Sequence, residues 1–110
     1  MMRGHSPNTR GEWEDAMTAY VVGQVVSVKD PDGFGEYRQR VGATIEQYRG
    51  KVLAAGQVEA LEGTWQPTMV VIAFDSAEQA REWYGCEEYR PLKELRQQTA
   101  NVDLVIIHGM

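Results

Sequence analysis

Three short stretches of this sequence are apolar on both faces of an extended strand, and they constrain the fold more than any other feature. They are residues 20–26, 69–74 and 104–107. A strand with one solvent-exposed face alternates apolar and polar residues, whereas a strand that is buried on both faces has a continuous apolar sequence. The helical sequence that remains can cover only one face of a small sheet. We therefore expect another layer, most simply a second copy of the chain, over the other face.

Length and charge limit the remaining possibilities. The chain has 110 residues and a net charge of −5, so we expect a single domain that does not bind nucleic acid or an anionic membrane surface. No apolar run approaches the roughly 20 residues that span a bilayer, and the first residues do not resemble a signal peptide. The single cysteine, Cys86, excludes an internal disulfide and fits a reducing compartment. Together these features predict a cytoplasmic protein.

The first residues differ in composition from the rest. Residues 1–16 are rich in glycine, polar and charged side chains, and Trp13 is their one aromatic residue. Such a segment cannot bury enough apolar surface to order itself. We expect residues 1–16 to form a flexible N-terminal arm, native or the product of an upstream start site, and residues 17–110 to form the folded domain.

From residue 19 onward the pattern predicts the order β-α-β-β-α-β. The first helix should begin at Asp30, a typical N-cap, with Pro31 in its first turn, and Gly50 should end it as a left-handed C-cap. Its inward side is expected to comprise Phe34, Tyr37, Val41, Ile45 and Tyr48. The expected strands are residues 19–28, 51–60, 68–74 and 101–107.

The second helical region should be interrupted. Ser76 and Gln79 form a capping box at its start, Gly85 breaks it, and the helix should restart between Tyr89 and Pro91. The residues expected to face inward are Ala77, Ala80, Trp83 and Tyr84, then Tyr89, Leu92, Leu95 and Thr99.

This order of elements predicts an α+β fold of the ferredoxin-like βαββαβ type. Both helical regions should cover one face of a four-stranded antiparallel sheet, and the other face should stay apolar and bare. Exposed apolar patches of several hundred Å² usually mark interfaces. Two such sheets packed face to face would give a homodimer, a dimeric α+β barrel.

The sequence resembles the domain-of-unknown-function family numbered 1330. The residues that carry the resemblance are Ala19 to Val22, Asp30-Pro31, Glu36-Tyr37, Tyr48, Leu61 to Pro67, Phe74, Ala80, Trp83-Tyr84 and Glu88-Tyr89. The resemblance covers about residues 18–109 and implies a ferredoxin-like homodimer of the dimeric α+β barrel superfamily, with no settled activity. The first strand is one residue longer than in the family pattern, which suggests a β-bulge.

Few residues suggest catalysis. The folded part has one histidine, His108, beside the predicted end of the last strand, and no group of residues has metal-ligand spacing, so we predict no metal and no cofactor. Haem is disfavoured because the helices contain no histidine. Glu62 is the best acid/base candidate, since Trp65 beside it could raise its pKa, although it could equally cap backbone N–H groups in a turn.

Polar-tipped aromatic residues are numerous for so small a core. Buried tyrosine and tryptophan need hydrogen-bond partners, so they often border a pocket, although they could also simply fill the core. Gln24 in a central strand would either bond such groups or face a ligand. The predicted ligand-binding residues, between helices and sheet, are Gln24, Tyr37, Tyr48, Trp65 and Trp83, with Glu62 at the rim.

Three functions are compatible with these features. The protein could bind a small, partly aromatic metabolite, it could be a cofactor-independent monooxygenase or isomerase of the kind found in the superfamily that it resembles, or it could be a purely structural dimer. The sequence leaves open whether it is an enzyme. A continuous cavity between helices and sheet would favour the first two functions over the third.

Overall fold

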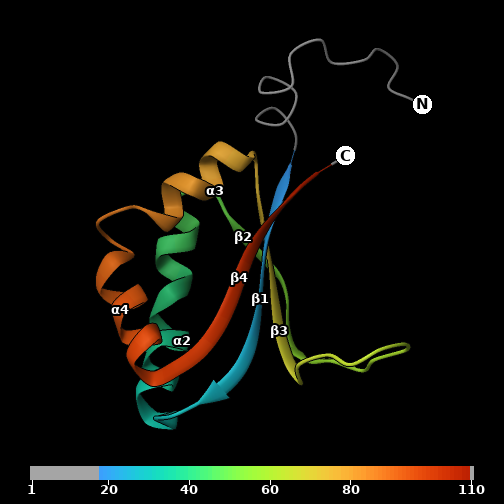
Figure 1. Ribbon diagram of the computed structural model, residues 1–110. Coiled ribbons are helices and arrows are strands. Elements are labelled where there is room, and N and C mark those ends of the chain that lie inside the picture. The colour runs from blue at the N-terminus through green and yellow to red at the C-terminus, as the bar shows by residue number, and fades with distance from the viewer. Residues whose placement is uncertain (1–17, 110) are drawn as a thin grey trace, which may run out of the picture.

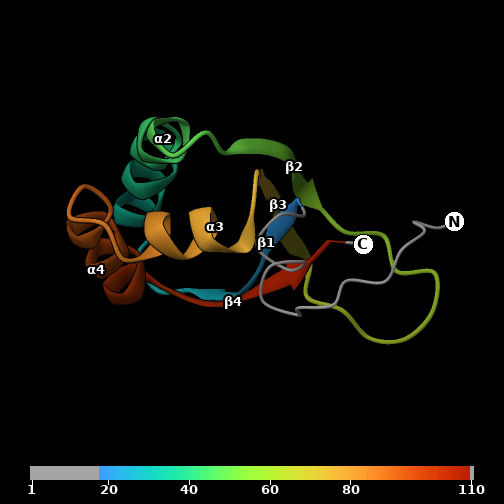
Figure 2. The same ribbon diagram turned by 90° about the horizontal axis from the view of Figure 1, so that it is seen from above.

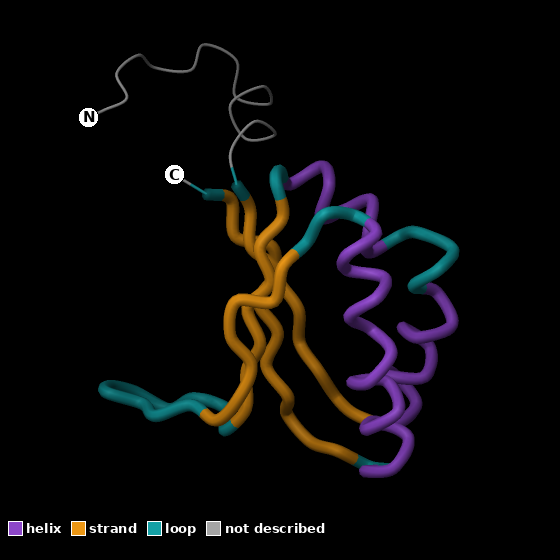
Figure 3. The backbone as a smooth tube through the Cα atoms, turned by 180° about the vertical axis from the view of Figure 1, so that it is seen from behind, coloured by secondary structure: helices purple, strands orange, loops and turns teal. Residues whose placement is uncertain are grey.

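Residues 18–109 form a four-stranded antiparallel sheet with three helices on one face (Figures 1 and 3). The computed structural model describes residues 18–109, so the arm expected at residues 1–16 lies outside the described residues. The elements are β1 (Ala19–Val28), α2 (Pro31–Gln47), β2 (Lys51–Gln57), β3 (Thr68–Phe74), α3 (Ala77–Tyr84), α4 (Arg90–Thr99) and β4 (Ala100–His108). The strand order β2-β3-β1-β4 confirms the predicted ferredoxin-like α+β fold.

The register of β1 separates the two faces of the sheet. Val21 lies opposite Ile72 and Ile106, on the side that the helices cover. Val22 points the other way, opposite Val71 of β3. The apolar residues that share this helix-free face are Tyr20, Val22, Val71, Ala73, Val105 and Ile107. Because Val105 and Ile107 are 55% and 50% exposed, the bare apolar face expected from the sequence is present in the single chain.

The helices begin where the capping residues predict. The Asp30 side chain accepts a hydrogen bond from the Gly33 N–H at 3.2 Å, and the Ser76 hydroxyl accepts one from the Gln79 N–H at 3.0 Å. The helix restart is also confirmed, since α3 ends before Gly85 and α4 begins after Tyr89. None of the helices in residues 18–109 is both long and apolar enough to cross a membrane.

α2 does not end as predicted. Arg49, not Gly50, adopts the left-handed conformation, with φ of 64°. Gly50 is required for space instead, because a Cβ at this position would lie 2.6 Å from both Ile45 Cγ2 and Phe74 Cε1. The prediction of a left-handed glycine C-cap at this position was therefore wrong.

The second strand is shorter than expected. It ends at Gln57 rather than Ala60, because its partner β3 starts at Thr68 and the preceding Pro67 has no N–H to donate. The last link before the loop is the hydrogen bond from the Val58 N–H to the Pro67 carbonyl, at 2.9 Å.

The bulge suggested by the extra residue in the first strand is confirmed. The pairing of β1 with β4 shifts register between Val25 and Ser27. β4 itself is one residue longer at each end than predicted, running from Ala100 to His108.

The end of α2 provides a direct test of this correction. Arg49→Gly should stabilise the protein by about 1 kcal/mol, because glycine adopts the left-handed conformation without steric cost. Gly50→Ala should destabilise it by about 1–3 kcal/mol through overpacking against Ile45 and Phe74. Both values can be measured by urea unfolding.

Arg49→Ala is the control, because it removes the exposed 3.8 Å ion pair with Asp75 and keeps the strained backbone. A stabilisation by Arg49→Ala as large as that by Arg49→Gly would contradict the conformational explanation.

Candidate functional site

A cavity of about 540 Å³ lies between α2 and the helix-covered face of the sheet. Its floor comes from β1, β2, β3 and β4, and most of its wall is apolar. Exposed residues at one side, including Arg38 of α2 and Val52 of β2, form its mouth. Figure 2 shows α2 on the β2 side of the helical layer and α4 on the β4 side. The cavity therefore lies beside the edge strand β2, all of whose residues are exposed.

Small residues on both sides keep the cavity open. Gly35 and Gly42 of α2 line it from above, and Ala55 and Gly56 of β2 line it from below. Gly35 and Gly42 are seven residues apart and therefore share one face of the helix. A Cβ at either glycine would have no neighbouring atom within 4 Å. Glycine inside a helix lowers the stability of the protein by about 1 kcal/mol relative to alanine. At these two positions no steric contact explains the choice of glycine.

Tyr37 provides a hydroxyl on the cavity wall. Its oxygen lies 2.9 Å from the hydroxyl oxygen of Tyr89, a fully buried residue that precedes α4. Burial, followed by the neighbouring Tyr89, raises the pKa of Tyr37 far above the ordinary tyrosine value. Tyr37 is therefore a neutral hydrogen-bonding group here and not a general base.

Trp83 of α3 forms another part of the wall and is held in place by a hydrogen bond. Its side chain is only 1% exposed, and its indole N–H donates to Thr44 Oγ1 at 3.1 Å. The Thr44 hydroxyl in turn donates to the Val41 carbonyl at 2.8 Å. The ring of Trp83 lies 4.3 Å from that of Tyr89, centroid to centroid. The indole ring is consequently fixed on several sides.

Arg96 of α4 is the charged residue deepest in the wall. The residue is 4% exposed, and its Nε–H donates to the Tyr89 hydroxyl at 3.4 Å. Burial acts to lower the pKa of Arg96, but Tyr89 and then Tyr37 outweigh it and raise the pKa above the ordinary arginine value. The side chain therefore remains a cation. Among residues 18–109, no carboxylate forms an ion pair with it.

The structure brings together two of the residues predicted to bind a ligand, Tyr37 and Trp83. Gln24 lies on the helix-free face, beside Met69 and Asp103 in the register. It therefore points away from this cavity, for the simple reason that side chains alternate along β1.

Tyr48 also lies outside the cavity wall. Its hydroxyl donates to Glu88 Oε1 at 3.5 Å, at the end of α2. A hydrogen bond with Cys86, followed by burial, raises the pKa of Tyr48 to about 12. Tyr48 thus joins α2 to the connection between α3 and α4.

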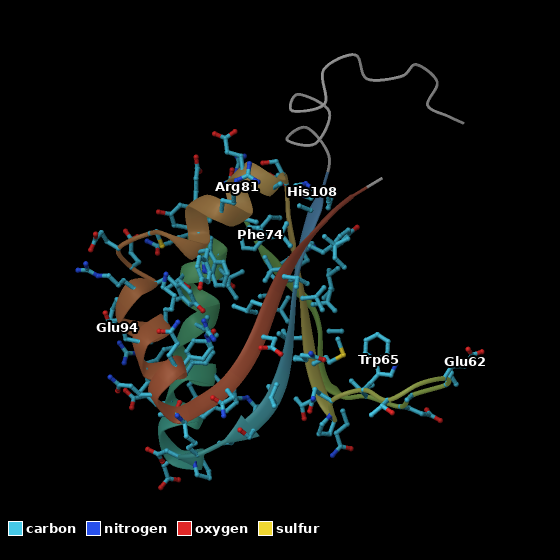
Figure 4. All side chains as sticks on the ribbon, in the orientation of Figure 1. Glu62, Trp65, Phe74, Arg81, Glu94 and His108 are labelled. Atoms are coloured by element: carbon cyan, nitrogen blue, oxygen red, sulfur yellow. The ribbon has the colours of Figure 1, made fainter. Side chains whose placement is uncertain are left out.

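Glu62 and Trp65 lie on the loop between β2 and β3, which projects away from the helices (Figure 4). The Trp65 indole N–H donates to the backbone carbonyl of Glu62 at 3.0 Å, and Trp65 is 57% exposed. Leu61 beside them is 91% exposed. Neither Glu62 nor Trp65 reaches the cavity of its own chain.

Arg96 was missed from the sequence although a signal was present. Tyr89, Leu92, Arg96 and Thr99 follow one another at helical spacing, and all four are buried. We expected Leu95 to take the inward position because it is apolar, and it is only partly buried. An arginine at helical spacing with residues that are expected to be buried is therefore a signal of a buried charge.

The chemistry available on the cavity wall is that of binding. Among residues 18–109, those that line the cavity include no Asp, Glu, His or Cys. Within the described part of the chain, no group of three such residues is close enough together to hold a metal ion. The wall offers an apolar and aromatic body, a neutral hydroxyl and a guanidinium, which suit recognition of a small molecule better than proton abstraction.

A family model described as Domain of unknown function (DUF1330) matches residues 18–110. No curated protein gives a significant sequence match.

Solved structures share the fold at low sequence identity. A protein of unknown function from Rhodopseudomonas palustris is 17% identical, with a TM-score of 0.72 over 97% of this chain and 98% of that one. SnoaB, a cofactor-independent oxygenase from Streptomyces nogalater, is 9% identical, with a TM-score of 0.65 over 86% and 95%. A dimeric protein of unknown function and ferredoxin-like fold from Bacteroides fragilis is 12% identical, with a TM-score of 0.60 over 84% and 96%. At these identities the likeness establishes the fold alone.

The support of Trp83 by Thr44 can be tested by unfolding. Thr44→Val should lower the free energy of unfolding by about 1–3 kcal/mol, because it leaves the buried indole N–H without an acceptor. Thr44→Ser keeps the hydroxyl oxygen and should lose clearly less. Equal losses in the two variants, measured by urea titration, would show that the hydrogen bond does not hold the ring.

Proposed function

The chain belongs to the DUF1330 family of proteins of unknown function, and we propose that it binds a small, partly aromatic metabolite in the cavity between α2 and the sheet. The observation that carries this proposal is the cavity itself. Its volume of about 540 Å³ is within the roughly 300–1,000 Å³ range of small-molecule sites. A core that served only stability would fill this space.

The glycines of α2 support the same conclusion. An alanine at position 35 or 42 would gain helix stability and meet no obstacle. Keeping both positions free of side chains preserves the volume of the cavity. This pattern is typical of a site in which stability is given up for function.

In this proposal Trp83 and Tyr37 have different roles. The rigid indole of Trp83 provides an apolar surface on which an aromatic ligand can stack. Tyr37 provides a directed hydrogen bond. Its partner Tyr89 accepts from Arg96, so Tyr89 can donate its own proton to Tyr37 and leave the Tyr37 O–H directed at a ligand.

A neutral probe of suitable size tests the cavity. In a Trp13→Phe, Trp65→Phe background, 2-naphthamide should quench the fluorescence of Trp83 saturably. At about 0.3 kcal/mol per non-hydrogen atom we expect a dissociation constant of about 1 mM or tighter. Trp83→Phe should weaken binding in calorimetry and leave the melting temperature within a few degrees.

Gly42→Leu should abolish binding, because its side chain enters the cavity. Ala43→Leu, one residue further along and on the exposed side of α2, is the matched control and should bind normally. If no aromatic probe binds, the protein is better explained as a structural dimer with an empty cleft.

A second candidate is a cofactor-independent monooxygenase or isomerase. Its support is the juxtaposition of the Arg96 guanidinium and the Tyr37 hydroxyl, which could stabilise an anion formed from a bound substrate. The fold shared with SnoaB is compatible with it. Because the wall offers no base, the substrate would have to be acidic enough to ionise by itself. Turnover in buffer free of metal and cofactor would separate this candidate from simple binding.

We also propose that the protein is a homodimer in the cytoplasm, formed by packing of the helix-free faces. The exposed residues Val105 and Ile107 support a second copy as the covering layer, and the Bacteroides fragilis neighbour is described as dimeric. The loop that carries Glu62 and Trp65 projects on the same side, so a ligand-site role for these residues would involve the partner copy. The lone free cysteine, Cys86, is compatible with a reducing cytoplasm.

The proposed dimer interface can be tested by introducing one charged side chain into it. Light scattering at micromolar concentration should give twice the mass of one chain. Val71→Glu, in the middle of the helix-free face, should dissociate the dimer and unfold it at the same time, because obligate dimers often have no stable monomer. Gln57→Glu on the exposed strand β2 is the control. A stable monomer of the unmodified protein would refute the proposal.

A further inference from the structure

The buried Arg96 has no counter-ion among residues 18–109, and this points to the chemistry of the ligand. A charge that is removed from water is normally paired, because an unpaired buried charge strongly destabilises the folded state. Arg96 is 4% exposed, and the exposed ion pairs of the described residues involve other arginines, Arg40, Arg49 and Arg90. Within residues 18–109, its guanidinium interacts with the hydroxyls of Tyr89 and Tyr37 and with no carboxylate.

The hydrogen bond to Tyr89 uses Nε, and the guanidinium also interacts with the Tyr37 hydroxyl. Donors remain on the two terminal nitrogens, because a guanidinium has five N–H groups. These two nitrogens form the end of a planar fork that matches the two oxygens of a carboxylate. Since Arg96 lines the cavity together with Tyr37, an anion there could be bound by the fork and by a neutral hydroxyl donor.

The charge of the cavity is opposite to that of the protein. The chain carries a net charge of −5, whereas the cavity wall contains two arginines, Arg38 and Arg96, and no Asp or Glu. Arg38 is exposed at the mouth and can attract an anion, while Arg96 is buried and can fix it. This arrangement would focus a small anion into the cavity despite an acidic surface.

We propose that the ligand is an organic anion, with a carboxylate or an equivalent planar oxyanion bound end-on by Arg96 and an aromatic or apolar body in the cavity against Trp83. This inference rests on the function proposed above and adds the charge of the ligand and the residue that recognises it.

A smaller cavity of about 290 Å³ on the β4 side is also lined by Arg96. It is lined mainly by polar residues and offers little surface for an apolar ligand body. The larger, mostly apolar cavity is therefore the site to which we assign the anion.

Two probes of the same shape distinguish the effect of ligand charge on affinity from the effect of ligand shape. 2-Naphthoate carries a carboxylate where 2-naphthamide carries a neutral amide, so the ratio of their dissociation constants reports the contribution of charge. The unmodified protein should bind 2-naphthoate at least about tenfold more tightly, a factor that corresponds to about 1.4 kcal/mol. Calorimetry at low ionic strength measures both constants.

Arg96→Met should remove this preference and leave the affinity for 2-naphthamide unchanged within about twofold. Arg96→Lys should restore part of it. Arg90→Met, on the same helix but in an exposed pair with Glu87, is the matched control and should keep the full preference. The melting temperature of Arg96→Met should stay the same or rise, because an unpaired buried charge has been removed.

Other outcomes overturn the inference in different ways. Equal binding of the two probes by the unmodified protein would refute the anion and leave the proposed function intact, whereas binding of neither would refute both. If Arg38→Met loses the preference for 2-naphthoate and Arg96→Met keeps it, the anion binds at the mouth of the cavity and not at Arg96. A marked fall in the melting temperature of Arg96→Met with an unchanged preference would make Arg96 a structural residue.

Discussion

The interior of this protein depends on the hydrogen bonds and ring contacts of Tyr89. This residue is fully buried, and its hydroxyl lies within hydrogen-bonding distance of Tyr37 on α2 and of Arg96 on α4. Its ring packs on Trp83 of α3. One side chain therefore fixes the relative positions of α2, α3 and α4. The residues on the cavity wall that carry polar groups are held by the same contacts.

The fold could be predicted from the sequence because its determinants are local. The caps at Asp30 and Ser76 and the continuous apolar strands need no knowledge of distant residues. Errors occurred where distant residues decide. Gly50 is a glycine because Phe74, remote in sequence, leaves no room for a Cβ. β2 ends early because Pro67 accepts a hydrogen bond from Val58 but has no N–H to donate in return.

The site could be predicted only in part, for the same reason. Tyr37 and Trp83 belong to inward-facing stripes and could be assigned to the interior from spacing alone. Arg96 was not assigned to the interior although its spacing indicated it, because charged residues are mostly exposed and a charge is assigned outward by default. Gln24, Glu62 and Trp65 were assigned to the ligand site because of their residue type. Which face of β1 the helices cover, and where the β2–β3 loop points, are consequences of tertiary structure.

The position of β1 in the sheet has a consequence for how the protein is made. β1 is a central strand and pairs with β4 from Ala19 opposite His108 to Val28 opposite Ala100. These partners are separated by nearly the whole described sequence, and such long-range pairing slows folding. During synthesis, the apolar β1 emerges from the ribosome long before β4 can pair with it. The nascent domain must therefore remain incomplete, with an apolar strand open to aggregation, until its last element is released.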